Sequence, residues 1–258
     1  VNNYVSDSGV YSATGNPALF ILKLNKTAGT AWTLGSNYFK VSLPVNTALV
    51  DSSSVRLATG LINFRAALGV TKVVTHIFMG DLHGNLWKLD FTSGDVVSTA
   101  DWTMNKLSYY KDSSSNPIPM FIAKDTAGKV QPISAAPNIV YGPIANSFYV
   151  LFGTGKYLEV ADKSSTTTQS AYMLYDNASV SRDSSTGVSA ISDRRRLKLG
   201  TANATTGVIT VPAYTLGRAT TNTDTDNPRS GWVADFPTTG ERQISNGTIF
   251  GNYVVFGS

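Results

Sequence analysis

The chain has 258 residues, a length that suits one large all-β unit or two small domains. Charged residues make up only 15% of it and hydrophobic residues 42%, so a sizeable core is available and long amphipathic helices are disfavoured. Cysteine is absent, which excludes disulfide staples and leaves the redox compartment undetermined. The net charge of +4 indicates solubility rather than nucleic-acid binding, because basic residues cluster only at 194–198.

The two ends of the chain indicate part of a longer polypeptide. Val1 is not a natural start, no basic and apolar leader follows it, and Ser258 comes directly after a strand-like stretch. No apolar run of about 18 residues occurs, so no transmembrane helix is expected. We expect residues 1–258 to form a single domain.

The clearest local prediction is a β-hairpin within residues 75–95. An apolar stretch leads into the turn Gly80–Asn85, whose Gly, Asp and Asn residues suit a tight turn, and Leu86–Phe91 returns as the second strand. Trp87 and Leu86 are apolar on opposite faces of that strand. A sheet covered on both faces permits this pattern, and a β-propeller blade between its neighbours is such a sheet.

The remaining chain predicts short strands separated by turns rich in Gly, Ser, Asn and Pro. Two stretches are ambiguous: 62–68 suits a helical turn as well as a strand, and 101–110 suits a strand or a short helix. The expected strands are 18–24, one or two within 32–43, 120–123, 138–141, 147–152, 156–158, 169–176, 196–199 as a charged edge strand, 208–211, 231–236, 243–245 and 248–256.

The hairpin pattern recurs along the chain. IFMGDLHGNLWKLD, residues 77–90, has a counterpart about 70 residues later in FYVLFGTGKYLEVAD, residues 148–162. A period of tens of residues is typical of a propeller or an array, and about four such units fit here. We therefore expect an all-β fold of short antiparallel strands, a β-propeller that is small or has an incomplete set of blades.

The residues offer little support for catalysis or metal binding. His76 and His83, the only histidines, are expected as a partly exposed strand residue and a turn residue, since nothing nearby completes a zinc site. No GxSxG elbow occurs, and Gly153–Lys156 lacks the spacing of a phosphate loop. The weak candidates for a cation site are Asn222, Asp224 and Asp226 in a loop that lacks the glycine and the distal Glu of a calcium loop.

Three other features have structural interpretations. Trp87 is expected in blade packing rather than in a sugar site. Glu241 and Arg242 are expected to form an internal ion pair near the last strand. Arg194–Arg196 is expected as a solvated loop that enters an edge strand and that could also contact a partner.

Four motifs in order resemble the C-terminal domain of the PilY/PilC family of type IV pilus tip and biogenesis proteins. They are FMGDLHGNLWKLD at 78–90, QPI at 131–133 followed by AAP at 135–137, FGTGKYL at 152–158 with Asp162 and QSxY, and GWxxDxP at 231–237 with GER at 240–242. The motif residues expected to be structural are Gly80, Asp81, Gly84, Asn85, Trp87, Asp90, Gly153, Gly155, Gln169, Tyr172, Trp232, Glu241 and Arg242.

The resemblance implies a β-propeller and a separate N-terminal region that lies outside this chain. It implies export to the pilus tip or outer-membrane surface of a Gram-negative bacterium, minor pilins and a host-surface ligand as partners, and a non-enzymatic role in pilus biogenesis, adhesion and twitching motility. Members of the family often carry an acidic calcium loop before the GDL turn. Residues 65–76 contain no carboxylate, so no calcium is expected there, and no other cofactor is implied.

Two alternatives remain open. The turns and strands also resemble those of quinoprotein dehydrogenases, enzymes that need a calcium-bound quinone and a carboxylate base, although no acidic cluster suited to these is visible. The third possibility is an outer-membrane assembly scaffold whose propeller makes only protein contacts.

Overall fold

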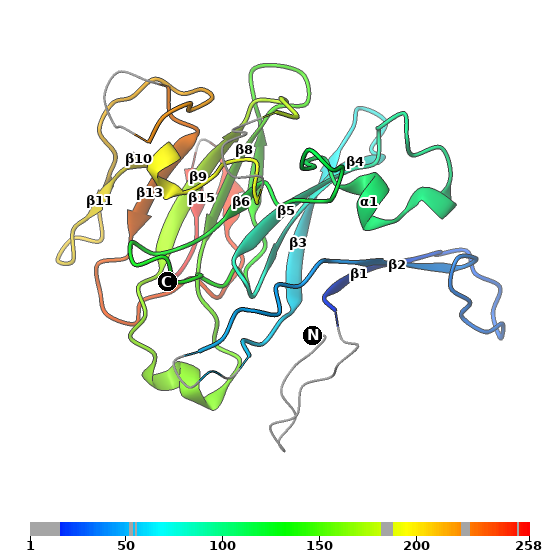
Figure 1. Cartoon of the computed structure of the whole chain (residues 1–258), viewed down its shortest axis with the longest axis horizontal. Coiled ribbons are helices and arrows are strands. Elements are labelled where there is room, and N and C mark those ends of the chain that lie inside the picture. Colours follow the sequence, from blue (N-terminus) through cyan, green and yellow to red (C-terminus); the bar gives the residue numbers. More distant parts are fainter. Residues whose placement is uncertain (1–15, 52–53, 55, 182–187, 223–227, 252) are drawn as a thin grey trace.

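The fold consists of two main β-sheets that stand side by side (Figure 1). The computed structural model describes residues 16–258 except 52–53, 55, 182–187, 223–227 and 252. Within that range, three two-stranded ribbons accompany the two sheets, and only short helical turns connect the strands. None of these turns has the length or the apolar character to cross a bilayer.

Most neighbouring strands in the two sheets are antiparallel. The first sheet has the order β3–β4–β5–β6, from strands β3 (Leu61–Leu68), β4 (Val74–Asp81), β5 (Asn85–Asp90) and β6 (Phe121–Ile122). The second has the order β10–β13–β9–β8–β7, from β7 (Asn138–Tyr141), β8 (Phe148–Gly153), β9 (Ser170–Asp176), β10 (Lys198–Leu199) and β13 (Gly231–Asp235). The short edge strand β10 is parallel to β13.

The smaller elements lie around these sheets. The ribbons pair β1 (Ala18–Leu22) with β2 (Tyr38–Ser42), β11 (Thr201–Ala202) with β12 (Ile209–Thr210), and β14 (Thr248–Phe250) with β15 (Tyr253–Val255). The helical turns are η1 (Thr99–Asp101), α1 (Met104–Leu107), η2 (Val160–Ser164) and η3 (Arg194–Arg196).

The predicted hairpin is confirmed as β4 and β5, and both of its faces are covered. Leu86 is buried in the core between the two sheets, whereas Trp87 and Leu89 are buried in a second core beneath the β1–β2 ribbon. The sheet is therefore packed on both sides, as a propeller blade is. The strands described here do not close into a ring.

The structure resolves the two ambiguous stretches and contradicts the second repeat. Residues 62–68 belong to strand β3 and do not form a helical turn, and 101–110 contains the short helix α1 and no strand. Residues 156–158 and 243–245 are not strands, so the second repeat does not form a hairpin like the first. After β8 the chain instead forms η2, and the next strand to pair with β8, on the side away from β7, is the more distant β9.

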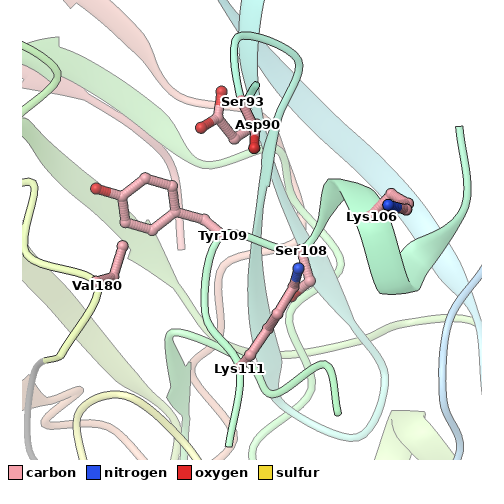
Figure 2. Close-up of a pocket in the computed structure, with 7 residues that line it drawn as sticks. All are labelled: Asp90, Ser93, Lys106, Ser108, Tyr109, Lys111 and Val180. Carbon is pink, nitrogen blue, oxygen red and sulfur yellow. The ribbon is translucent and has the colours of Figure 1, made fainter. Parts of the chain in front are cut away.

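A hollow of about 340 Å³ opens where β5 ends beside α1 (Figure 2). Its polar lining includes Asp90, Lys106 and Lys111, together with the ring of Tyr109. In the described part of the chain, Asp90 forms no ion pair with either lysine.

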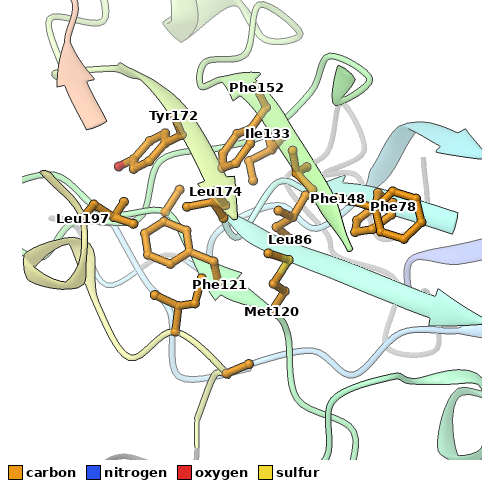
Figure 3. Close-up of a cluster of buried hydrophobic side chains, with 14 of the residues drawn as sticks. Phe78, Leu86, Met120, Phe121, Ile133, Phe148, Phe152, Tyr172, Leu174 and Leu197 are labelled. Carbon is orange, nitrogen blue, oxygen red and sulfur yellow. The ribbon is translucent and has the colours of Figure 1, made fainter. Parts of the chain in front are cut away.

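The main core fills the space between the two sheets (Figure 3). The first sheet contributes Phe78 and Leu86, and the second contributes Phe148, Phe152 and Tyr172. The rings of Phe78 and Phe148 meet edge to face at 5.1 Å, which joins β4 to β8. Sheets whose facing sides share one apolar core are the expected arrangement of adjacent blades.

A buried ion pair crosses this core. Nζ of Lys88 on β5 lies 2.6 Å from Oδ2 of Asp176 on β9, and neither side chain is exposed. The Lys88 ammonium also lies 3.5 Å from the ring centroid of Tyr109, and the Tyr110 hydroxyl donates to Asp176 over 2.8 Å. Both charges are compensated, so the pair links the two sheets at the centre of the core.

We predict that Lys88→Met destabilises the fold by about 3–5 kcal/mol, because it leaves the Asp176 carboxylate buried without its cation. Adding Asp176→Asn should restore much of that loss, since Asn keeps an acceptor for Tyr110 and carries no charge. Urea denaturation of the wild type, both single variants and the double variant measures the coupling.

The exposed pair Arg195–Asp193 provides the control. Arg195→Met should cost far less than Lys88→Met, because a solvated pair contributes little. Equal losses for Lys88→Met and Arg195→Met would contradict a linking role for the buried pair.

Candidate functional site

The GDL turn is held together by one buried carboxylate. Asp81, 2% exposed, accepts hydrogen bonds from the backbone N–H groups of His83 and Asn85, at 2.9 and 3.0 Å. It also accepts from the Asn85 amide at 2.9 Å and from the Trp87 indole at 3.0 Å. Burial raises the pKa of Asp81, whereas these hydrogen bonds act to lower it. The Asp, Asn and Trp of this motif thus form one hydrogen-bonded unit.

The QPI stretch connects that turn to the second sheet. Gln131, 1% exposed, donates to Ser170 Oγ at 2.8 Å and to the Thr168 carbonyl at 2.9 Å, and it accepts from the Tyr172 hydroxyl at 2.5 Å. Burial raises the pKa of that hydroxyl. Gln131 therefore ties the segment after β6 to the start of β9.

Arg242 of the GER motif holds the loop that follows the GTG motif. The Arg242 guanidinium donates to four backbone carbonyls, those of Gly240, Lys156, Asp162 and Ser165, at 2.8–3.2 Å. The prediction of an ion pair between Glu241 and Arg242 is wrong. The Glu241 carboxylate instead accepts from the Thr238 backbone N–H and the Ser258 hydroxyl. Arg242 acts as a cap for the carbonyls around η2.

Motifs that are far apart in sequence meet at the ends of the two sheets. A β-carbon on Gly80 would collide with Ile133, and the Gly155 N–H donates to the Pro132 carbonyl at 2.7 Å. A β-carbon on Gly155 would lie 2.5 Å from Cβ of Arg242, and one on Gly153 would collide with Gln243. We call this junction the motif seam: Gly80–Asn85, Gln131–Ile133, Gly153–Gly155, Gln169–Tyr172 and Arg242.

Trp87 adjoins the seam through its hydrogen bond to Asp81, and three further motif residues lie outside the seam. Asp90 accepts from the Thr92 backbone N–H and hydroxyl, both at 2.7 Å, and so closes the turn after β5. Trp232 is half-buried on β13, opposite Met173 of β9. Glu241 lies on the loop that leads to Arg242, and none of the three faces the GDL turn through a hydrogen bond in the described residues.

A groove of about 670 Å³ lies beside the motif seam, and we call it the seam groove. Its floor includes Leu82 and Pro132 of the seam. Its walls are Leu49–Asp51 with Arg56–Ala58, the turn residues 124–125 and 128–130, and the loop residues Lys156, Glu159, Asp162, Ser165 and Thr167–Gln169, with Arg242. A volume of this size is typical of a ligand pocket.

The burial of Lys88, of Asp176 and of both histidines was not predicted from the sequence. Lys88 and Asp176 lie on different sheets, and no local pattern connects them. His76 and His83 are 1% and 3% exposed, which contradicts the expectation of a partly exposed strand residue. His83 approaches the Leu57 carbonyl at 3.3 Å, and His76 lies 3.6 Å from Asp90.

The arginine cluster also differs from the solvated loop that was expected. Arg194–Arg196 forms the 3₁₀ turn η3, which the Asp193 side chain caps through the Arg195 N–H. Arg194 pairs with Asp235 at 3.0 Å, and Arg196 is buried. The Arg195 side chain remains 67% exposed.

The cation candidates are only partly placed. Asn222 lines a second groove, next to η3, whereas Asp224 and Asp226 lie outside the described residues. In the stretch before the GDL turn, where the family resemblance implied that a calcium loop can occur, residues 69–73 form a tight turn closed by the Gly69 N–H and the Val73 carbonyl at 2.8 Å. That turn contains Lys72 and no carboxylate, so its residues do not fit calcium. The described residues contain no group of three or more His, Asp or Glu placed to hold a metal ion.

Comparison with known proteins defines the class of this fold and seam. Residues 61–202, more than half of the chain, match the family described as the PilY1 beta-propeller domain. A type IV pilus biogenesis factor PilY1 from Pseudomonas aeruginosa PAO1 is 30% identical over 202 residues, which cover 71% of this chain and 16% of that protein. A PilY1 homolog from Xylella fastidiosa is 34% identical over 107 residues, covering 42% of this chain and 7% of that protein.

A solved structure gives the same result. The crystal structure of the P. aeruginosa PilY1 C-terminal domain superposes with a TM-score of 0.59 at 25% identity, over 84% of this chain and 46% of that one. The fold is therefore that of a β-propeller domain. The chain belongs to the PilY1 β-propeller family, and it spans only a small part of the length of these curated relatives.

The close approach at Gly84 leads to a prediction. Gly84 has φ +77°, and a β-carbon there would lie 2.7 Å from the Ala123 carbonyl oxygen and 2.8 Å from that of Gln131. Gly128 has φ +83° with open space around it. Gly128→Ala should cost about 1 kcal/mol through backbone strain, and Gly84→Ala about 1–3 kcal/mol more through overpacking. Equal losses in urea denaturation would contradict the importance of the close approach.

The buried His76 leads to a second prediction. Burial, and then the Lys88 cation, lower its pKa from 6.5 to about 4, against the smaller opposing effects of Asp90 and Asp176. The unfolded chain therefore binds a proton at a higher pH than the folded one does. Stability should be fully present above pH 6.5 and should fall as the pH drops towards 4, by about 3 kcal/mol from this group.

The measurement is the free energy of unfolding across that pH range for the wild type and for His76→Gln. Other titrating groups, such as Asp81, contribute to both proteins and cancel in the difference. The variant should lose less stability on acidification than the wild type. Parallel curves would show that His76 is not the group responsible.

Proposed function

We propose that this chain is the propeller part of a type IV pilus biogenesis factor that acts by binding other proteins, without catalysis. The observation that carries the proposal is the family relationship, together with the inward use of the motif residues. Asp81, Gln131 and Arg242 direct their polar groups at the protein's own backbone and side chains. Residues used in this way shape a rigid surface and are not available to a substrate.

The setting of the protein is part of the same proposal. The full protein is exported and acts at the pilus tip or at the outer-membrane surface of a Gram-negative bacterium, in pilus assembly, adhesion and twitching motility. Its partners are minor pilins, its own N-terminal region and a host-surface ligand. Residues 1–258 serve as a single propeller unit within that protein. The relatives' names as pilus biogenesis factors support this setting.

The first test removes this domain from the full-length gene in its native host. Cells with the deletion should lose surface pili, adhesion and twitching, scored by electron microscopy, binding assays and motility plates. The full-length gene supplied in trans is the matched control and should restore all three. Unchanged piliation, adhesion and twitching in the deletion strain would overturn the proposal.

The second test locates the protein with immunogold labelling, using antibody against this chain. We expect gold at the filament ends. Gold over the envelope with bare tips would favour the outer-membrane scaffold instead. Oxidation of an alcohol by the purified protein, supplied with calcium and pyrroloquinoline quinone, would favour the quinoprotein enzyme.

A further inference from the structure

The β1–β2 ribbon has one buried face and one exposed face. Leu19 and Val41 are buried in the core that the ribbon shares with the first sheet. Phe20 and Leu22, on the opposite face of β1, are 51% and 53% exposed. Lys40 pairs with Phe20 across the ribbon, and its Nζ lies 5.8 Å from the centroid of that ring. The outer face of the ribbon is therefore both apolar and basic.

The connection between β1 and β2, residues 23–37, continues this surface, and we call it the ribbon loop. It extends away from both main sheets, at the right of Figure 1. Leu24 is 100% exposed, Trp32 51% and Leu34 58%. Single exposed apolar residues are common on proteins, whereas large apolar side chains gathered on one surface mark an interaction site. The ribbon loop carries such a group where the core of the domain does not cover it.

The polar groups of the ribbon loop hold its shape. Lys26 Nζ donates to the Thr30 carbonyl at 2.6 Å and lies 4.9 Å from the ring centroid of Trp32. The Asn37 side chain accepts from the Thr33 backbone N–H at 2.7 Å. The loop is thus ordered before it meets a partner, which lowers the conformational entropy lost on binding.

The ribbon and its loop carry positive charge only. Residues 8–50 contain no Asp or Glu and three lysines, Lys23, Lys26 and Lys40. Among the described residues, none of these lysines forms an ion pair. On the segment that packs beneath the ribbon, Asp101 is occupied in capping η1. An anionic partner would therefore meet cations here without opposing carboxylates from the ribbon.

Shape and chemistry select the class of partner. The ribbon loop is a projection, and a lipid surface can surround a projecting apolar side chain without a matching cavity. Trp at the headgroup level, beside basic residues that face anionic lipids, is typical of proteins that bind a membrane surface. A nucleic acid would also attract the lysines, but Leu22, Leu24 and Leu34 offer no ring on which a base can stack.

We propose that the ribbon loop and the outer face of the β1–β2 ribbon bind the surface of a bilayer with anionic headgroups. Leu24, Trp32 and Leu34 enter the headgroup region, and Lys23 and Lys40 contact the lipid phosphates. The inference goes beyond the proposed function, which concerns protein partners. Its tests involve no pili, so their failure leaves the proposed function unaffected.

The first test is vesicle flotation with the purified full-length protein. Vesicles of phosphatidylglycerol and phosphatidylethanolamine supply anionic headgroups, and phosphatidylcholine vesicles are the neutral comparison. The protein should float with the anionic vesicles, and less of it should float as salt is added, because the lysines are exposed. Equal flotation with both kinds of vesicle, or none with the anionic ones, would overturn the proposal.

Charge reversal assigns the binding to the ribbon. Lys23→Glu with Lys40→Glu should weaken binding to anionic vesicles at least about tenfold, since each basic residue near an anionic surface contributes to the attraction. The matched control, Lys124→Glu with Lys129→Glu, makes the same charge change at two exposed lysines on the turn after β6. It should float as the wild type does. Equal losses in the two double variants would make net charge responsible and would rule out the ribbon as the site.

Removal of apolar side chains tests their insertion. Leu24→Ser with Leu34→Ser should reduce flotation with anionic vesicles about tenfold or more, although no charge changes. Leu199→Ser with Val208→Ser is the matched control, because these side chains are 55% and 56% exposed on other elements. Full flotation of the ribbon-loop variant would overturn the role of insertion.

A single thiol shows whether the ribbon loop is free in the full-length protein. The chain has no cysteine, so Leu24→Cys adds one thiol at the loop, with the unsubstituted protein as background. A maleimide reagent should modify it in solution, and anionic vesicles should protect it. Protection without vesicles would mean that another part of the protein or a second copy covers the loop, and the inference would fail. It would fail equally if the protein bound a single-stranded oligonucleotide and not the vesicles.

Discussion

The arrangement of the two sheets depends on an ion pair that neither sheet could bury alone. Lys88 and Asp176 are both fully enclosed, and each would be costly without the other. An apolar pair could fill the same space and give comparable stability, so we attribute to the charges a role in specifying which strands face each other. The aromatic ring of Tyr109 over the ammonium supports the same register.

The motif seam extends that specification to the ends of the sheets. Gln131 reaches Ser170 and Tyr172 across the junction, and glycines allow the backbone segments to approach where a side chain would collide. A family signature made of such residues describes how blades join.

Local features of the fold were predictable from sequence, and long-range ones were not. The β4–β5 hairpin follows from its own turn residues and from apolar residues on both faces. The prediction of a second hairpin at 148–162 failed because β8 pairs with β9, which begins only at Ser170. No local sequence pattern indicates this pairing. For the same reason, the sequence did not predict the ion-pair partner of Lys88 or the burial of His76, which both depend on distant segments. Arg242 beside Glu241 suggested an ion pair, yet Arg242 donates to the carbonyl of Asp162 in η2 and to those of Lys156 and Ser165 on either side of it.

The placement of charged groups on the surface could not be predicted from the sequence either. A net charge of +4 in a chain of this length indicates little more than solubility. Folding decides where these charges lie, because Glu159 and Asp162 share the Lys156 ammonium and Asp125 bonds within its own turn, while Lys124 and Lys129 stay exposed. The seam groove takes Leu82 from the turn after β4 and Gln169 from the residue before β9, so residues next to both sheets line it. The Lys88–Asp176 pair joins the same two sheets from inside the core, at a place that does not line the groove.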